Sequence, residues 1–366
     1  MSNNVPIYME IYQDFHKKIL EGFYKEGDML PPETEICKQY LVSRITVQKA
    51  LHKLTEKGLI TRIPGKGTFV SGISATPNNK KISRIGLILC DFGVSYGVNL
   101  VRSIEKHLSR NEKALIIKNT YFDKDRESQA ILDMLQQDVD GIILQPAHNE
   151  IFNPVIMRLS ISKFPMVLID RDLRGLDLPF VGTDNIASTI NVMDYLFEQG
   201  HRHICFMSPS PDNTSTIEER LDGFQRAFIR HNFINHSSNI FTDIITPTIK
   251  PTPTSIREDI DKIKVHIKSN PQHTCIFAEE YSVCSLVKQA LKELEKSIPD
   301  DMSLVSFDNI NDPLFFTKTA YVRQNESEIG IRAVDLLLNS IDNKGNNTKI
   351  MLSGDFIKNA SIKKIN

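Results

Sequence analysis

A basic stretch between residues 44 and 66 holds the side chains best suited to contact nucleic acid. Six lysines and arginines stand there against a single acid, Glu56, whereas the whole chain of 366 residues has a net charge of −1. Guanidinium, ammonium and amide groups donate hydrogen bonds to phosphate oxygens and to base edges. Such a local excess is typical of a DNA-binding surface, although a basic helix by itself is equally typical of an ordinary solvated face.

A helix followed by a hairpin would present these side chains. Ser43 is a good N-cap. Four apolar residues at helical spacing predict the buried face of the helix that follows: Val47, Ala50, Leu51 and Leu54. The opposite face would then carry Arg44, Ile45, Gln48, Lys49, His52 and Lys53. Residues 59–63 and 68–70 predict two hairpin strands, and the glycines of the intervening Pro64-Gly65-Lys66-Gly67 allow close approach to a sugar-phosphate backbone.

Two further helices are expected upstream, one opening at Pro6-Ile7-Tyr8 and one following Leu30-Pro31-Pro32-Glu33. With these elements, residues 5–72 resemble the winged helix-turn-helix domain of the GntR family of bacterial regulators. The resemblance, together with the exposed position of Lys49, implies that the following residues contact DNA: Arg44, Thr46, Gln48, Lys49, Gly65, Lys66 and Gly67. Pro32 stands where that family usually has Ser, and Gln48 where it usually has Arg. Because Gln favours adenine and Arg favours guanine, a more A·T-tolerant half-site is expected.

The rest of the chain alternates apolar, β-branched runs with amphipathic segments, which predicts parallel sheets with helices on both faces. The runs are 85–89, 115–117, 141–144, 166–169, 204–207, 275–277 and 304–307. Ligands of such sheets bind beyond the carboxyl ends of the strands. Polar residues stand at several of these ends: Asp91, Gln145, Asp170, Glu279 and Asp308. Any one of them could instead be a helix cap or a turn residue, but their recurrence favours a binding site.

A series of strings between residues 85 and 309 carries a second resemblance, for example Asp140-Gly141-Ile142-Ile143-Leu144 and Glu219-Arg220-Leu221-Asp222-Gly223-Phe224. They resemble the effector domain of LacI-type repressors, whose fold is that of periplasmic sugar-binding proteins. This resemblance implies two lobes, three chain crossings and a ligand cleft between the lobes. It places ligand contacts on Tyr96, Asp170, Arg171, Thr216, Arg220, Glu279 and Asp308. Gln145 is a further candidate, and Phe92 or Tyr96 would stack on a sugar because the chain has no Trp.

The expected fold class is therefore α/β: a small winged helix-turn-helix domain at 1–72, a polar linker at 73–82, and a two-lobed, periplasmic-binding-protein-like effector domain at 83–366. No apolar run is long enough to span a membrane and the chain opens without a signal-peptide core, so a soluble, cytoplasmic protein is expected. The five cysteines are scattered and form no CxxC pair, which favours reduced structural thiols.

Two smaller features were weighed for chemistry. His201 and His203 precede a predicted strand, and because no third ligand follows at a suitable spacing they are interpreted as a polar turn. The Pro/Thr-rich segment at 248–254 is interpreted as an exposed loop. No metal and no cofactor is expected.

These observations predict a sequence-specific regulator of transcription, a repressor of carbohydrate-use genes, and not an enzyme. A homodimer would bind a palindromic operator in double-stranded DNA, and a monosaccharide in the cleft would change operator affinity. A sugar phosphate or a nucleobase, including one acting as co-repressor, remains an alternative effector. An enzyme-fused GntR protein would need a Schiff-base lysine in its own strand and loop context, which we do not find. An unregulated nucleoid-type binder would leave the residues after 82 without a role.

Overall fold

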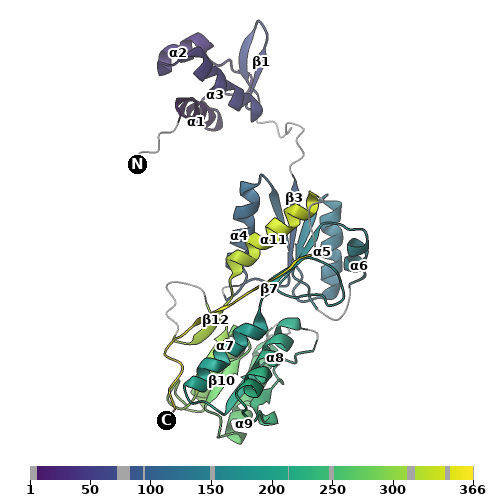
Figure 1. Ribbon diagram of the computed structural model, residues 1–366. Helices are drawn as coiled ribbons and strands as arrows, with labels where there is room; N and C mark the ends of the chain where they lie inside the picture. Colours follow the sequence, from purple (N-terminus) through teal and green to yellow (C-terminus); the bar gives the residue numbers. More distant parts are fainter. Residues whose placement is uncertain are drawn as a thin grey trace. The chain divides into compact units, whose positions relative to one another are not determined.

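The structure, a computed structural model, describes residues 6–71, 83–93, 95–148, 153–212, 214–246, 251–310, 318–342 and 347–365. The chain divides into two compact units, Met1–Ile82 and Ser83–Asn366 (Figure 1). The linker expected at 73–82 lies outside the described residues. No described helix is both long enough and apolar enough to cross a membrane.

The first unit packs three helices and a hairpin around one core. Its elements are α1 (Ile7–Leu20), α2 (Glu33–Tyr40), α3 (Arg44–Glu56), β1 (Ile60–Ile63) and β2 (Gly67–Val70). The four predicted apolar residues of α3 are all buried, together with Ile11 and Phe15 of α1. The Ser43 hydroxyl caps α3 by accepting a hydrogen bond from the Thr46 N–H at 3.4 Å. The hairpin is antiparallel, with Ile60 paired to Val70. The predicted recognition helix and hairpin are therefore confirmed.

The first lobe of the second unit is a parallel sheet with helices on both faces. Its strands are β3 (Arg84–Leu89), β4 (Ala114–Asn119), β5 (Gly141–Leu144), β6 (Met166–Ile169), β7 (Phe180–Thr183) and β13 (Lys349–Leu352), in the order β13-β7-β6-β5-β3-β4. Helices α4 (Val98–Arg110) and α11 (Glu326–Ile341) bury their apolar residues against one face. Helices α5 (Lys124–Gln136) and α6 (Pro154–Ile161) cover the other.

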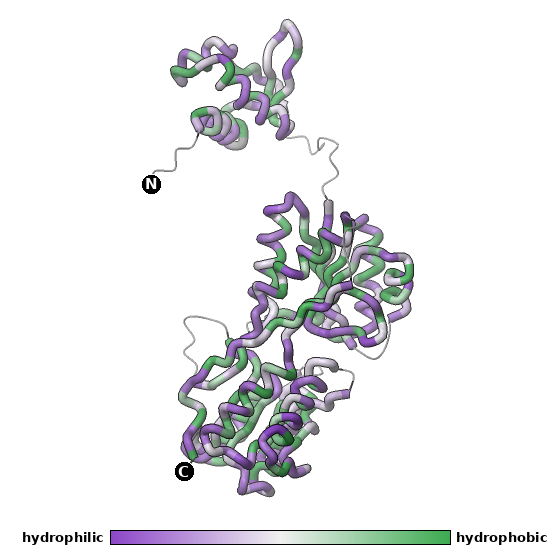
Figure 2. Tube along the Cα trace, viewed as in Figure 1, coloured by the Kyte–Doolittle hydropathy of each residue, from purple (hydrophilic) through white to green (hydrophobic). Residues whose placement is uncertain are grey.

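The second lobe repeats this arrangement. Its strands are β8 (Ile204–Met207), β9 (Ile240–Phe241), β10 (Cys275–Ala278), β11 (Ser303–Phe307), β12 (Ala320–Arg323) and β14 (Asp355–Ile357), in the order β14-β12-β11-β10-β8-β9, with only β14 antiparallel. Helices α7 (Asn185–Glu198) and α8 (Ser215–Arg230) cover one face. Helices α9 (Pro253–Ser269) and α10 (Tyr281–Glu293) cover the other, and a short 3-10 helix, η1 (Ser237–Asn239), precedes β9. Figure 2 shows hydrophobic residues concentrated along the strands of both sheets.

The chain passes between the lobes three times, after β7, after β12 and after β13, as expected. The α/β fold class is thereby confirmed, including the parallel strands. One local interpretation holds only in part. The described residues of the Pro/Thr-rich segment are exposed, but they form the start of a helix, because Thr252 caps α9 and Pro253 is its first residue. Proline is well suited to that position since the first helical N–H has no partner within the helix. Thr248 lies outside the described residues.

Candidate functional site

The exposed face of α3 and the tip of the hairpin hold the residues predicted to contact DNA. Arg44, Ile45, Lys49 and His52 are exposed, while Gln48 and Lys53 are half-buried. Thr46 lies in the first turn, where its hydroxyl is 3.0 Å from that of Ser43. At the hairpin tip the N–H of Lys66 donates to the carbonyl of Ile63 at 3.0 Å. Gly65 and Gly67 have φ of 73° and 128°, so this tight turn depends on glycine.

An acid that the sequence analysis did not assign lies among these cations. Glu33, the first residue of α2, accepts hydrogen bonds from Arg44 Nε at 2.8 Å and from Gln48 Nε2 at 3.1 Å. Arg62 of β1 lies 3.3 Å from the same carboxylate. Burial raises the pKa of Glu33, but the bonds from Arg44 and Gln48 outweigh it and lower the pKa below its ordinary value. Glu33 therefore stays ionised and orients both predicted base-reading side chains.

In the second lobe, Arg220 is the centre of a buried polar network. From α8 its Nε donates to Asn185 Oδ1 at 3.0 Å, and its NH1 group donates to Glu279 Oε1 at 2.8 Å and to the Glu279 carbonyl at 3.0 Å. The guanidinium also stacks on Phe307, with 3.9 Å between its carbon and the ring centroid. Arg220 and Glu279 are 4% and 3% exposed. A buried charge pair with this many partners holds both groups in fixed positions.

Acidic groups beside Arg220 have raised pKa values. Burial raises the pKa of Asp308 to about 7, against the opposing effects of Arg220 and Gln324. Gln324 Nε2 donates to Asp308 Oδ2 at 2.7 Å, and Gln324 accepts from the Thr183 hydroxyl at 2.7 Å. Burial also raises the pKa of Glu279, and burial and Glu279 together raise that of Glu280 to about 8. Burial therefore favours the protonated form of these carboxyls relative to exposed ones.

The first lobe contributes a second polar group at the ends of β5 and β6. Gln145 donates from Nε2 to Asp170 Oδ2 at 2.7 Å and accepts at Oε1 from the N–H of Cys90 at 3.0 Å. Arg171 donates to the Ala147 carbonyl at 2.8 Å, and its Nε is buried without a hydrogen-bond partner. The hydroxyl of Tyr96 is buried and also lacks a partner. Unpaired buried donors are costly, which favours a ligand at this position.

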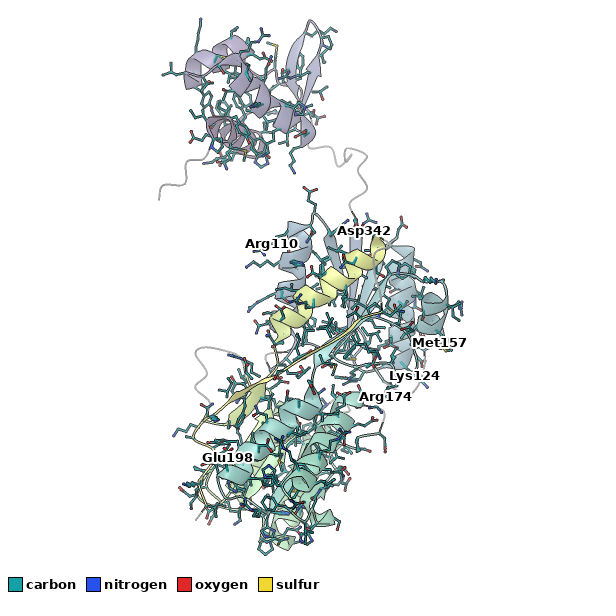
Figure 3. The ribbon with its side chains drawn as sticks, viewed as in Figure 1. Arg110, Lys124, Met157, Arg174, Glu198 and Asp342 are labelled. Atoms are coloured by element: carbon teal, nitrogen blue, oxygen red, sulfur yellow. The ribbon has the colours of Figure 1, made fainter. Side chains whose placement is uncertain are left out.

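Charges of the two lobes act on one another. Asp170 and Arg171 of the first lobe shift the pKa of Glu279 in the second, after the larger effects of burial and Arg220. The pKa of Tyr96 is raised well above its ordinary value, first by burial and then by Asp170, Glu326 and Asp308. Arg174, labelled in Figure 3, lies in the segment after β6 and pairs with Glu218 of α8 at 2.9 Å. Side chains at the strand ends of the two lobes therefore lie close enough to interact.

Not every predicted residue joins this group. Asp91 is exposed and its side chain accepts from the N–H of its neighbour Phe92 at 2.8 Å, which is a turn contact. Phe92 is 39% exposed. Thr216, in contrast, is 6% exposed and lies one helical turn before Arg220 on the same side of α8.

Several residues of the network were missed: Asn185, Phe307, Gln324 and Glu326. Glu326 accepts hydrogen bonds from the N–H groups of Gly97, Asn99 and Leu100, at 2.8, 3.2 and 3.2 Å, and so caps α4. Gln324 and Glu326 directly follow β12, a strand that was not predicted. The signal that could have found them is the polar run Gln324-Asn325-Glu326 after the short apolar stretch 320–322.

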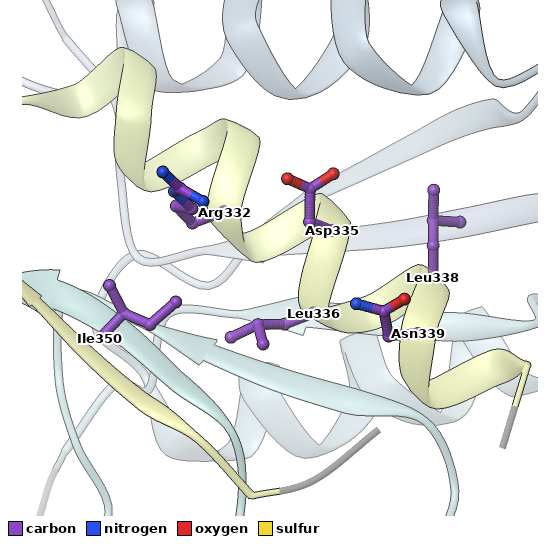
Figure 4. A pocket seen from close by; sticks show the side chains of 6 residues that line it. All are labelled: Arg332, Asp335, Leu336, Leu338, Asn339 and Ile350. Atoms are coloured by element: carbon purple, nitrogen blue, oxygen red, sulfur yellow. The ribbon is translucent and has the colours of Figure 1, made fainter. Parts of the chain in front are cut away.

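A separate surface pocket lies on the outer side of α11 and does not contain the predicted ligand residues. Figure 4 shows its lining by Arg332, Asp335, Leu336, Leu338, Asn339 and Ile350.

His201, considered above as a metal ligand, uses both ring nitrogens elsewhere. They lie 2.8 Å from the Thr274 hydroxyl and 3.0 Å from the Lys363 carbonyl. All five cysteines are free thiols.

Comparison with known proteins agrees with both halves of this description. Residues 7–70 match the family described as bacterial regulatory proteins, gntR family, and residues 85–314 match the periplasmic binding protein domain. An arabinose metabolism transcriptional repressor of Geobacillus stearothermophilus is 26% identical over 351 residues, covering 93% of this chain and 92% of the relative.

Two solved structures share the fold. The transcription regulator CcpA of Lactococcus lactis is 18% identical with a TM-score of 0.66, covering 77% of this chain and 100% of that one. A LacI family transcriptional regulator from Enterococcus faecium, solved with bound ribose, is 21% identical with a TM-score of 0.64, covering 78% and 100%.

Proposed function

The chain belongs to the periplasmic binding protein domain family and joins that domain to a gntR-family DNA-binding domain, and we propose that it represses carbohydrate-use genes under the control of a monosaccharide. Its relatives are transcription regulators, and it is a regulator and not an enzyme. The effector binds between the two lobes of the second unit. The relative named as an arabinose repressor and the ribose-bound neighbour support a sugar ligand.

The observation that carries this proposal is the position of Arg220. Its guanidinium is held by Asn185 and Glu279 at the carboxyl end of the second sheet, and the Asp308 carboxyl lies at the next strand end. Sugar hydroxyls each need a partner once they leave water, and charged donors and acceptors give the stronger hydrogen bonds. Phe307 packs under the guanidinium and helps to hold it in place. We assign ligand contact to Tyr96, Asp170, Arg171, Thr216, Arg220, Glu279 and Asp308.

A neutral sugar suits this cleft better than a sugar phosphate. The Arg220 charge is already paired with Glu279, at 2.8 Å. Arg171, the other arginine of this group, lies 3.8 Å from the Asp170 carboxylate, and Asp308 and Glu280 add further carboxyls. A phosphate dianion would therefore meet two arginines that are already paired with carboxylates, whereas sugar hydroxyls can donate to carboxylates and accept from Arg171.

On the DNA side, we assign base and backbone contacts to Arg44, Thr46, Gln48 and Lys49 of α3 and to Gly65, Lys66 and Gly67 of the hairpin. Two chains pair as a homodimer in the cytoplasm and place two recognition helices on the half-sites of a palindromic operator. Sugar binding favours one arrangement of the lobes and lowers operator affinity. To do so the sugar binds the two arrangements unequally, and a coupling of about 1–3 kcal/mol is typical.

A thermal-shift screen of the full-length chain tests the effector assignment. Neutral pentoses and hexoses, their phosphates and nucleobases are each added in large excess, since a ligand at a hundred times its Kd stabilises by about 2.7 kcal/mol. A neutral sugar is expected to raise Tm, and Arg220→Ala to abolish the shift. Asp308→Asn is the second variant, in case Arg220→Ala does not fold. If only a sugar phosphate or a nucleobase raises Tm, the effector belongs to that class and not to the neutral sugars. If no compound raises Tm, the assignment of a small-molecule sensor is contradicted.

A further inference from the structure

A buried group of one cysteine and two histidines lies in the second lobe, apart from the residues assigned to the effector. Cys205 is the second residue of β8, His266 stands near the end of α9, and His273 lies in the loop before β10. One donor atom of each lies within 4.8 Å of the donor atoms of the other two. Cys205 and His273 are 0% and 4% exposed, and His266 is half-buried. We propose that these three residues bind one zinc ion per chain.

The spacing of the donor atoms fits zinc. Cys205 Sγ lies 3.4 Å from His266 Nε2. In a tetrahedral site, bonds of about 2.3 Å to sulfur and about 2.0–2.1 Å to nitrogen place these two atoms about 3.5 Å apart. This edge of the tetrahedron therefore already has the required length, and the His273 donor lies within 4.8 Å of both atoms. The group contains thiol and imidazole and no carboxylate, a donor set that favours zinc over calcium or magnesium.

Both histidine rings also have the outer partners that metal-bound histidines usually have. The His266 ring hydrogen bonds to the backbone of Ser238, and His273 Nε2 lies 3.3 Å from Asn239 Oδ1. Asn239 is 1% exposed and is itself held by Asn235 at 3.1 Å. A bond of this kind fixes the tautomer and the ring orientation and leaves the other nitrogen free for a metal. The two rings stack at 5.6 Å with 22° between their planes, so they are fixed relative to each other.

The position of the group indicates a structural ion and not a second effector. Cys205 and His273 lie at the start of β8 and before β10, whereas Glu279 and Asp308 follow the opposite, carboxyl ends of β10 and β11. An ion here would join β8, the end of α9 and the loop before β10. Because the three ligands are brought together only in the folded lobe, zinc would stabilise that lobe.

Cobalt substitution of the full-length chain tests the site. After treatment with a chelator, the protein is titrated with Co²⁺ and then with Zn²⁺. One equivalent of Co²⁺ is expected to give visible ligand-field bands of tetrahedral intensity and a thiolate-to-cobalt charge-transfer band in the near ultraviolet. Zn²⁺ should displace both sets of bands and raise Tm. Cys205→Ser is expected to lose the charge-transfer band, and His266→Gln to weaken Co²⁺ binding at least tenfold.

The control variant is Cys275→Ser. Cys275 is equally buried on the neighbouring strand β10, but its side chain packs in the cluster on the opposite face of the sheet. This variant should keep the full cobalt spectrum. His266→Gln keeps the test decisive if Cys205→Ser does not fold, since His266 is half-buried on a helix. If wild-type protein lacks the charge-transfer band, or if the band is unchanged in Cys205→Ser, the zinc site is contradicted and the group is only a thiol–imidazole hydrogen bond.

Discussion

Glu33 has a role that its neighbours along the chain do not reveal. The excess of basic residues between 44 and 66 predicts a DNA-facing surface, but the acid that orients Arg44 and Gln48 lies outside this window, on α2. The contact joins residues 11 and 15 positions apart, and no helical or strand period connects them. Residue types therefore give the candidate DNA contacts, while the hydrogen bonds that hold these side chains depend on the packing of α2 on α3.

Gln48→Arg is expected to change which base pair is preferred. Gln pairs best with adenine and Arg with guanine, and a good bidentate contact contributes about 1–3 kcal/mol of discrimination. Selection from a randomised duplex library should therefore show one A·T pair in each half-site replaced by G·C. Lys49→Ala is the matched control on the same helix, and it should weaken binding to all sequences alike. It should also reduce the magnitude of the slope of log binding constant against log salt concentration by about one. If Gln48→Arg selects the same consensus sequence as wild type, Gln48 does not contact a base.

Asp308 is expected to make the folded chain less stable as pH rises. Its pKa is about 7 in the folded state, against about 3.9 for an unfolded Asp. The folded state therefore binds the proton more tightly, so the free energy of unfolding falls between about pH 4 and pH 7 and stays low above that. Asp308→Asn should raise Tm more at pH 8 than at pH 5. The exposed Asp300→Asn is the control for the loss of one carboxyl group. Equal shifts for Asp308→Asn would contradict the raised pKa.

The strands with long apolar runs were predicted well and several others were missed. Runs of buried apolar residues predicted β5, β6 and β8 to the residue and β3 to within one. Strands β12, β13 and β14 were missed because they are partly exposed and therefore carry no continuous apolar run. The buried four-residue β7 was missed because Gly182 and Thr183 shorten its apolar run, and the two-residue β9 was missed as well. Missing β12 also hid Gln324 and Glu326, which follow it. The pair Thr252-Pro253 is a typical signal for the start of a helix. The Pro/Thr-rich composition of the surrounding segment nevertheless led to the loop interpretation.

Glu326→Ala should destabilise the second unit strongly. The carboxylate is 6% exposed and accepts three backbone N–H groups at the start of α4. Leaving buried donors unpaired costs about 1–3 kcal/mol each before water enters, so a total of about 2–4 kcal/mol is expected. Glu328→Ala, on the exposed side of the same helix, removes only an ion pair with Arg332 and should cost about 0.3–0.5 kcal/mol. Urea unfolding measures both, and equal losses would contradict the capping role.

The two-lobed organisation follows from contacts far apart in sequence. The Thr183 hydroxyl bonds to Gln324, 141 residues later, where two of the crossing segments meet. No local period predicts such a pairing, and only the resemblance to a known family led to three crossings. The same resemblance placed Arg220, Glu279 and Asp308 in one site, where the structure brings them together. It did not provide Asn185 or Gln324, which hold Arg220 and Asp308 in position.

Arg174→Ala should weaken effector binding modestly. Arg174 and Glu218 pair across the two lobes at 2.9 Å, with 59% and 21% of their side chains exposed. A partly exposed ion pair contributes about 0.2–1 kcal/mol. If this energy is lost only in the effector-bound arrangement, the effector Kd is expected to rise by up to about fivefold. Arg226→Ala, which breaks a pair with Asp222 within α8, should leave the Kd unchanged. Calorimetric titration compares the two, and equal values for wild type and Arg174→Ala would show that this pair does not favour the bound arrangement.

We propose that a sugar bound by the second unit controls the DNA affinity of the first. The most direct test is fluorescence anisotropy of the selected operator with the full-length chain, titrated with the sugar found by thermal shift. Operator affinity should fall about 5- to 150-fold at saturation, as for a coupling of about 1–3 kcal/mol. Asp308→Asn should need more sugar for the same release while binding the operator normally without it. A saturating sugar that leaves operator affinity unchanged would contradict the account.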